Sequence, residues 1–454
     1  MPRSRRILIF SFVLSILFLE LGMKTKLLFA MPPVKREVLA NGLVLLVSED
    51  HSLPSLTLQL LVDAGSRRDP VGEEGLSYLT ARGILLGTSR HSLAQINEEL
   101  DFMGASLEVT TGRDTIVLGL RVLKKDLDRG LDLFMETAMK PSFPVEELQR
   151  EIQQTIAAIQ SEEDVPQAVA EKIFQRTLFS NGPYGHPVVG TKESLSRLTR
   201  EAALRFYQTY YHPNNAILTV VGDTTFAEVK AKLAPLQEGW ATAQIPEKHF
   251  TTQFAKGPEA VKVNRDIAQA NVILGNGGIS RDNPDFYAVS LMNFILGGAG
   301  FGSRLFDEIR VKRGLAYDVR SFLDPGKYPG SFQIILQTKN ASAREAIQIS
   351  LREMERMQGA LVSTEELERA KQYMIGSFPL RLDTQAQLAS FLNQVEYYKL
   401  GLRYPEEFPK RIAAVTREDV LRVAKAYLQP KTYVLVVVGN LQEVGMGEGE
   451  PPIR

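Results

Sequence analysis

Residues 198–222 read LTREAALRFYQTYYHPNNAILTVVG, and residues 415–439 read VTREDVLRVAKAYLQPKTYVLVVVG, at an offset of 217. Each copy starts on Thr-Arg-Glu, continues with the spacing of an amphipathic helix, and reaches a proline that disfavours further helix. An apolar run typical of a strand then follows in both copies. Agreement in spacing and residue type over this length indicates an internal duplication. The sequence therefore predicts two copies of one α/β domain.

Apolar runs with partial alternation open the first copy. Residues 42–48 and 56–64 are two such runs, and a polar turn that contains His51 and Pro54 joins them. Two strand-like runs joined by a short polar turn are typical of a β-hairpin. We therefore expect these two strands to pair with each other.

The second copy repeats this opening. Residues 270–275 provide the corresponding strand, and residues 278–282, GISRD, repeat residues 65–69, GSRRD. Long helical patterns follow the strands, as at residues 127–137 and 145–162 of the first copy. Strands combined with long helices in this order favour an α+β fold. We expect two homologous domains, each a mostly antiparallel sheet with helices packed on one face.

The two copies do not account for the whole chain. Residues 242–257 show no clear period, and the C-terminal residues are rich in Gly, Glu and Pro. The predicted organisation is a signal peptide at 1–30, a first domain at 31–241, a linker at 242–257, a second domain at 258–443 and a flexible tail at 444–454.

The N-terminal segment has the pattern of an export signal. Three arginines within the first six residues precede an apolar run from Ile7 to Leu19, Glu20 interrupts it, and the small residue Ala30 precedes Met31. This pattern is typical of a secretory signal peptide that is cleaved near Ala30, and it predicts a periplasmic or secreted protein. The alternative is an uncleaved signal anchor, which would attach the protein to the membrane.

Composition excludes several classes of protein. The chain has 454 residues, of which 44% are hydrophobic and 23% charged, so it can form more than one folded core. Its 53 basic and 53 acidic residues give no net charge, which argues against nucleic acid as a partner. It contains no cysteine, which excludes disulfides, thiolate metal sites and a cysteine nucleophile. The absence of cysteine also suits an oxidising periplasm.

The segment at 65–70, GSRRDP, and the segment at 75–88, GLSYLTARGILLGT, carry a resemblance to a known family. They are similar to the opening domain of the insulinase/pitrilysin peptidases, in the short branch that includes mitochondrial processing peptidase. The resemblance extends over nearly the whole chain after residue 30, including the duplication, and it implies that the chain forms one half of a clamshell. The family signature is an inverted zinc motif, H-x-x-E-H, on a helix, in which two histidines bind zinc and the glutamate activates water.

The resemblance implies that this chain has lost the zinc site. The first histidine corresponds to Tyr78, the general base to Ala81 and the second histidine to Arg82. Downstream the family pairs two glutamates seven residues apart, and here Glu151 keeps the first whereas the ligand position is Ala158. We therefore expect no metal in this chain. Our hypothesis is that the guanidinium of Arg82 takes the place of the family's cation and pairs with Glu151.

The remaining candidates for chemistry are weak. No histidine has a second histidine or a carboxylate three or four residues away on a plausible helix, so all five are expected to be ordinary loop or surface residues: His51, His91, His186, His212 and His249. The serine motif G-x-S-x-G is absent. Residues 298–303, GAGFGS, resemble a nucleotide-binding loop but lack both its third glycine and a P-loop lysine.

Residues 303–317, SRLFDEIRVKRGLAY, are similar to the second-domain signature of the same family. There an arginine and a tyrosine, seven residues apart, bind the substrate carbonyl and stabilise the oxyanion of the tetrahedral intermediate. The corresponding residues are Arg310 and Tyr317. Guanidinium and phenol groups are donors that suit developing negative charge. The alternative is a surface arginine on a charged helix and a tyrosine packed in the core.

The resemblance thus implies half of an active site. We expect a zinc-free subunit of a heterodimeric peptidase, whose partner is a paralogue that carries H-x-x-E-H and zinc, and whose substrate is a peptide or unfolded protein. The segment 104–111 could pair with an extended peptide as an edge strand, but Glu108 and Val109 replace the Asn-Ala pair of active members. Two rivals stay open: an inactive structural or peptide-binding homologue resembling respiratory-complex core subunits, and a self-contained peptidase with an unrecognised site.

Overall fold

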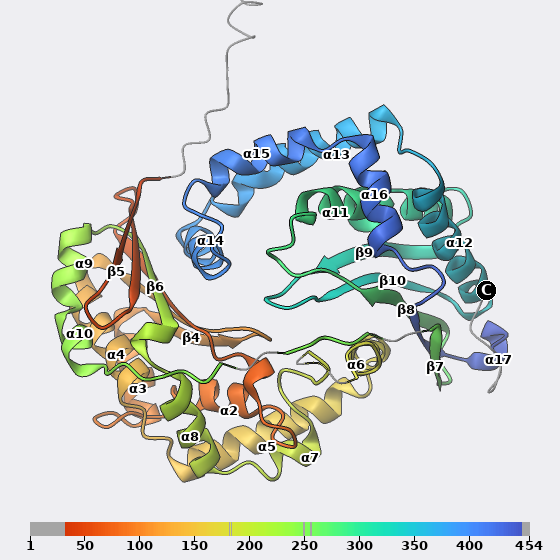
Figure 1. The fold of residues 1–454 in the computed structure, drawn as a ribbon. Helices are drawn as coiled ribbons and strands as arrows, with labels where there is room; N and C mark the ends of the chain where they lie inside the picture. Colours follow the sequence, from red (N-terminus) through yellow and green to blue (C-terminus); the bar gives the residue numbers. More distant parts are fainter. Residues whose placement is uncertain (1–31, 181, 183, 248–249, 255–256, 447–454) are drawn as a thin grey trace, which may run out of the picture.

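The structure, a computed structural model, describes residues 32–180, 182, 184–247, 250–254 and 257–446. The predicted signal peptide and most of the predicted tail lie outside the described residues. Within them the chain forms two β-sheets, each with its own layer of helices, and these two halves lie side by side (Figure 1). The expected α+β fold of two domains is confirmed.

The first half is built on a six-stranded sheet. Its order is β1-β2-β6-β3-β5-β4, and only the β2–β6 pairing is parallel. Its strands are β1 Val34–Val38, β2 Val44–Glu49, β3 Ser55–Val62, β4 Ser106–Thr111, β5 Ile116–Leu123 and β6 Ala216–Gly222.

The second half repeats this sheet with five strands. Its order, β7-β11-β8-β10-β9, matches β2-β6-β3-β5-β4 strand for strand, including the single parallel pair at β7–β11. Its strands are β7 Glu259–Asn264, β8 Gln269–Gly277, β9 Ala316–Asp324, β10 Ser331–Lys339 and β11 Val434–Gly439. The two strands of the sequence repeat, β6 and β11, occupy the same place in each sheet. The shared order confirms the duplication.

The expected hairpin between the first two apolar runs is wrong. Strands β2 and β3 are not neighbours, because β6 lies between them, parallel to β2 and antiparallel to β3. The five residues that connect β2 to β3 are long enough to pass over an intervening strand. Alternation of apolar residues identifies strands but does not identify their neighbours, and the strand that separates this pair comes more than 150 residues later.

Helices cover each sheet. In the first half they are α2 Leu76–Gly83, α3 Leu93–Met103, α4 Leu127–Met139, α5 Val145–Glu162, α6 Pro166–Leu178, α7 Lys192–Leu195, α8 Arg200–Tyr210, α9 Phe226–Lys232 and α10 Ala234–Gly239. In the second half they are α11 Phe286–Asn293, α12 Asn340–Gly359, α13 Thr364–Ser377, α14 Gln385–Tyr397, α15 Tyr404–Ala414, α16 Arg417–Tyr427 and α17 Leu441–Val444. Among the described residues, no helix has the length and hydropathy needed to cross a bilayer.

One helix of each half packs on the sheet of the other half. Helix α6 lies against β8 and β11 of the second sheet, and α14 lies against β3 and β6 of the first (Figure 1). The two helices are close to equivalent in the repeat. Each half therefore has its own helices on one face of its sheet and a helix of the other half on the opposite face.

This exchange explains why the central strands are apolar on both faces. In β11, Leu435 and Val437 belong to the second half's own core, whereas Val434, Val436 and Val438 pack with α6 residues such as Phe174. A strand covered on both faces reads as a continuous apolar run, as the VLVVVG of β11 does.

Polar contacts also join the halves. Arg36 of β1 forms a two-pronged ion pair with Glu396 of α14, at 2.9 and 2.7 Å. Buried Thr219 of β6 donates to Asn393 of α14 at 2.8 Å. The connection at residues 242–257 has no helix or strand in its described part. The halves are thus held by packing and hydrogen bonds as well as by the chain.

Candidate functional site

Helix α2 carries the first group of predicted site residues. It begins after Gly75, whose φ of +92° is left-handed and where a Cβ would lie 2.6 Å from the carbonyl oxygen of Val189. The carboxylate of Asp69 accepts from the N–H groups of Gly75 and Ser77, each at 2.8 Å. A carboxylate at a helix N-terminus satisfies N–H groups that have no partner within the helix. Residues 69–75 therefore fix the start and direction of α2.

The four degenerate positions do not form a metal site. Tyr78 is half-buried, Ala81 is buried and Arg82 is half-buried on α2, whereas Ala158 is exposed on α5. Alanine has no ligand atom, and arginine carries the wrong charge. Within the described ranges, no group of three or more His, Cys, Asp or Glu side chains could hold a metal ion. The residues present therefore do not fit the zinc that the resemblance associates with this position.

An ion pair occupies this position instead. The Nε of Arg82 donates to Oε1 of Glu151 at 2.8 Å, and Nη2 donates to Oε2 at 3.3 Å. The Glu151 side chain is 8% exposed and that of Arg82 38%. The hydrogen bond to Glu151 and the charge of its carboxylate raise the pKa of Arg82. The hypothesis that these two residues pair is confirmed, and the pair connects α2 to α5.

Each described histidine contacts a carboxylate or a backbone carbonyl oxygen. Nδ1 of His51 lies 2.6 Å from Asp223, and Nδ1 of His91 lies 3.1 Å from Glu136. His186 and His212 contact backbone carbonyl oxygens only. His249 lies outside the described residues. These contacts are those of loop and surface histidines.

Arg310 and Tyr317 form the second group. Arg310 lies in a π-helical segment, η5 Phe306–Val311, and Tyr317 is the second residue of the edge strand β9. Between them Gly314, at φ +64°, donates its N–H to the carbonyl oxygen of Arg310 at 3.0 Å. This turn reverses the chain, so that the guanidinium carbon of Arg310 lies 4.6 Å from the centre of the Tyr317 ring. The structure brings the two predicted residues together.

The guanidinium of Arg310 and the hydroxyl of Tyr317 are available as donors. Tyr317 is 80% exposed, and Arg310 forms no ion pair within the described part of the chain. They line a cavity of about 590 Å³ together with the glycine-rich segment 298–301. Asp318, the one carboxylate among the described residues of this lining, pairs with Arg320 at 3.0 Å. The cavity therefore presents a guanidinium and a phenol with no competing carboxylate bound to them.

The glycine-rich segment has a role that its weak likeness to a nucleotide-binding loop does not predict. It places Phe301 against Arg310, with 5.3 Å between the guanidinium carbon and the centre of the ring. The centre of the Phe306 ring lies 4.8 Å from the same guanidinium carbon. Gly300 and Gly302 have φ of +63° and +80°, and Phe301 between them is 77% exposed. A lone aromatic residue between two glycines in a tight loop was the available signal.

Strand β4 is an edge strand, as expected for segment 104–111. In the part of the chain that the structure describes it pairs with β5 alone, and Glu108 is exposed. Its outer edge is therefore open to a further strand.

Comparisons with known proteins agree with this architecture. The sequence profile described as insulinase (peptidase family M16) matches residues 44–192, and the profile described as peptidase M16 inactive domain matches residues 197–374. An "uncharacterized zinc protease" of Rickettsia bellii is 28% identical over 405 residues, covering 88% of this chain and 97% of its own length. A "non-peptidase homolog" of Helicobacter pylori is 25% identical over 86% of this chain and 90% of its own.

A solved structure supports the same relationship. The crystal structure of a peptidase M16 inactive domain from Pseudomonas fluorescens superposes with a TM-score of 0.85 at 27% identity, and the match covers 93% of this chain and all of that one.

Proposed function

The chain belongs to the insulinase family of peptidases (family M16) and lacks the zinc ligands of that family, and from this we propose that it is the zinc-free subunit of a two-subunit peptidase. Its partner would be a paralogue that carries H-x-x-E-H and holds the zinc. Alone, this chain would be inactive. The substrate would be a peptide or an unfolded protein, because a clamshell of two subunits excludes folded proteins from its interior.

The observation that carries the proposal is the arrangement of Arg310 and Tyr317. Both donors border one cavity, the rings around Arg310 hold its guanidinium in place, and no carboxylate neutralises it among the described residues. Pre-positioned donors of this kind stabilise negative charge on a carbonyl oxygen more effectively than water does. In the complex, Arg310 and Tyr317 would bind the substrate carbonyl and then the oxyanion of the tetrahedral intermediate.

In this proposal no step within this chain needs a metal. Tyr78, Ala81 and Ala158 offer no ligand set, and Arg82 already balances the charge of Glu151. The first half would instead close the chamber around the peptide. The segment at 1–30 supports export to the periplasm, with membrane attachment only if that segment is not cleaved.

The test combines this protein with the H-x-x-E-H paralogue and measures cleavage of an unfolded protein. We expect cleavage only when both chains are present. Arg310→Ala should lower kcat about 100-fold or more, as for loss of an oxyanion donor, without preventing assembly on size exclusion. Tyr317→Phe removes only the hydroxyl and should give a smaller loss in the same direction. Arg352→Ala, at an exposed arginine of α12, is the control and should be neutral.

The alternative is an inactive structural or peptide-binding homologue. The name of the Helicobacter pylori relative, a non-peptidase homolog, favours this reading. If the paralogue cleaves equally well without this chain, or if Arg310→Ala changes nothing, the proposed role in catalysis is wrong and the alternative stands.

A further inference from the structure

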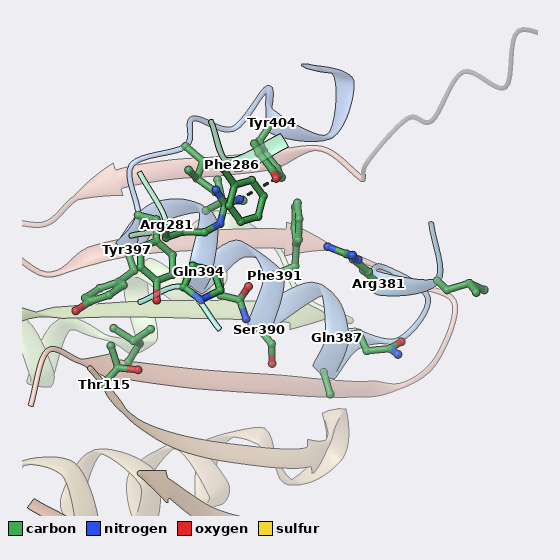
Figure 2. A pocket seen from close by; sticks show the side chains of 17 residues that line it. Thr115, Arg281, Phe286, Arg381, Gln387, Ser390, Phe391, Gln394, Tyr397 and Tyr404 are labelled. Atoms are coloured by element: carbon green, nitrogen blue, oxygen red, sulfur yellow. Dashed lines mark hydrogen bonds between the residues drawn. The ribbon is translucent and has the colours of Figure 1, made fainter. Parts of the chain in front are cut away.

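A second cavity, of about 780 Å³, lies along α14 and is lined by residues of both halves (Figure 2). One wall is α14 itself, and Thr115, next to β5, lies on the side of the first sheet. The opposite wall comes from Arg281 and Phe286, before and at the start of α11, and from Tyr404 of α15. This cavity shares no lining residue with the one at Arg310 and Tyr317.

The cavity carries positive charge. Arg281 and Arg381 line it, and the described residues of its lining include no Asp or Glu. Neither arginine forms an ion pair within the described residues. Figure 2 shows the two guanidinium groups on either side of Phe391. A cation in a partly enclosed space without a carboxylate partner favours an anionic ligand.

The Arg281 side chain is held in one orientation. Its guanidinium carbon lies 3.8 Å from the centre of the Phe286 ring and 5.5 Å from that of Tyr404. Its Nη2 donates to the Tyr404 hydroxyl at 2.8 Å, drawn as a dashed line in Figure 2. Burial raises the pKa of Tyr404 to about 12, so the hydroxyl keeps its proton. The guanidinium is therefore fixed by the two rings, and its other N–H groups remain as donors.

Neutral polar groups stand beside this charge. Gln387, Ser390 and Gln394 lie on one side of α14, spaced by three and four residues, and Figure 2 shows them along the same wall. The amide of Gln394 has no side-chain hydrogen bond among the described residues. An amide side chain both donates and accepts, which is what a peptide bond requires of its partner.

We propose that this cavity, which we call the α14 cavity, binds the C-terminal end of a peptide. The α-carboxylate lies against Arg281, the last peptide group is hydrogen-bonded by Gln394, and an apolar C-terminal side chain packs on Phe286 and Phe391. One carboxylate needs one fixed guanidinium, whereas a nucleoside phosphate needs several cations that converge. The two arginines here stand apart, and this favours the peptide end.

The test measures binding to the isolated protein by calorimetry. The probes are acetyl-Ala-Ala-Phe with a free carboxylate, the same peptide as its C-terminal amide, and ATP. We expect the acid to bind about tenfold or more tightly than the amide, the ratio set by one charge-assisted contact. Arg281→Gln should remove that preference, and Gln394→Ala should weaken acid and amide equally. Arg352→Gln makes the same charge change on α12 and should bind as the original protein does.

The outcomes separate the possibilities. Equal binding of acid and amide, no binding at about 1 mM peptide, or retention of the preference in Arg281→Gln would overturn the proposal. Binding of ATP in place of the peptide would also overturn it. Because Arg281 stacks on two rings, Arg281→Lys serves as a second variant if Arg281→Gln unfolds, and it should reduce the preference for the acid because lysine lacks the fixed planar guanidinium. The measurement needs no partner subunit, so failure of the proposed peptidase role would leave it unaffected.

Discussion

At the scale of single residues, Arg82 and Glu151 show how a family site changes when its metal is lost. The glutamate is retained and nearly buried, and a buried carboxylate needs a positive partner. Arg82 supplies that charge from its own side chain, on helix α2, at the position that corresponds to a histidine of the family motif. The pair therefore keeps α2 and α5 connected without any ion from solution.

This account predicts unequal effects of removing either partner. Arg82→Met leaves Glu151 buried without a partner and should lower the free energy of unfolding by about 2 kcal/mol, reduced from a fully buried pair because Arg82 is half-buried. Glu151→Gln should cost about 1 kcal/mol, since water can reach Arg82.

Urea unfolding gives both values. The double variant Arg82→Met with Glu151→Met should recover at least half of the loss, because no charge is left unpaired. Arg150→Met, one position away and 59% exposed, should change stability by less than about 0.5 kcal/mol. A double variant less stable than both single variants would contradict the account.

A second residue-scale prediction concerns acid. Glu366 accepts from Arg304 at 2.7 and 3.0 Å at the base of the glycine-rich segment. Burial opposes its ionisation, but hydrogen bonds from Arg304 and Ser363 outweigh it and lower its pKa from 4.5 to about 2. A lowered pKa in the folded state means that this stabilisation is full above pH 4.5 and is lost as the pH falls towards about 2.

The melting temperature measured from pH 6 to pH 2 tests this. Glu366→Gln should lower Tm at pH 6 and should flatten its fall below pH 4.5, compared with the original protein. Glu365→Gln, at an exposed neighbour with no ion pair in the described chain, is the control and should keep the original slope. An unchanged slope in Glu366→Gln would count against the pairing with Arg304.

At the scale of elements, the exchange of α6 and α14 makes each half depend on a helix of the other. Phe174 of α6 is fully buried, and the strands it packs on belong to the second sheet. Phe174 therefore stabilises the second half, although its helix belongs to the first half in sequence.

Phe174→Ala should cost about 3–5 kcal/mol and should accelerate amide hydrogen exchange in β8 and β11 in particular. Phe134→Ala is a matched control, since Phe134 is equally buried but lies in the first half's own core. It should accelerate exchange in the first sheet. If both variants changed the same strands, the exchanged helix would have no local role.

The elements also show how far the sequence could predict the structure. The repeat at 198–222 and 415–439 predicted the duplication, and the family motifs predicted both the Arg82–Glu151 pair and the proximity of Arg310 to Tyr317. Each of these predictions rests on the spacing of nearby residues or on the alignment of a segment of this chain with a motif of the family.

What could not be predicted depends on contacts between distant segments. The position of β6 between β2 and β3 is one example, and the exchange of α6 and α14 is another. The continuous apolar run of β11 did indicate burial on both faces, but it did not say which helix covers the second face. The α14 cavity draws on residues from 61 to 404, so no window of sequence contains it.

At the scale of the whole molecule, the exchange and the polar contacts join the halves more firmly than their connection does. Lys327 of the β9–β10 turn donates to Asp63 of the first half at 2.7 Å, and Asp63 also pairs with Arg67 and Arg68. The positive charge of these three side chains, against the effect of burial, lowers the pKa of Asp63. The packing of α6 and α14 on the opposite sheets, together with this ionic cluster around Asp63, therefore links the halves.

A cut in the connection should not separate them. If a specific protease site is inserted after Thr242 and cleaved, we expect both fragments to elute together on size exclusion in native buffer and to unfold in one transition with urea. The same cut in Phe174→Ala should weaken the association. Separation of the fragments in native buffer would show that the exchanged helices contribute little.

The reciprocal placement of α6 and α14 also bears on how such a chain could arise. Two separate copies of a half-length chain that each lent one helix to the other would form a domain-swapped homodimer with twofold symmetry. Fusion of the two genes turns that encounter into an intramolecular one, at a fixed effective concentration. Once fused, the copies no longer need identical surfaces, and each is free to diverge. A tandem duplication thus frees both halves from the constraint of symmetry. Under this condition one half can keep Arg310 and Tyr317 while the other half replaces its zinc ligands.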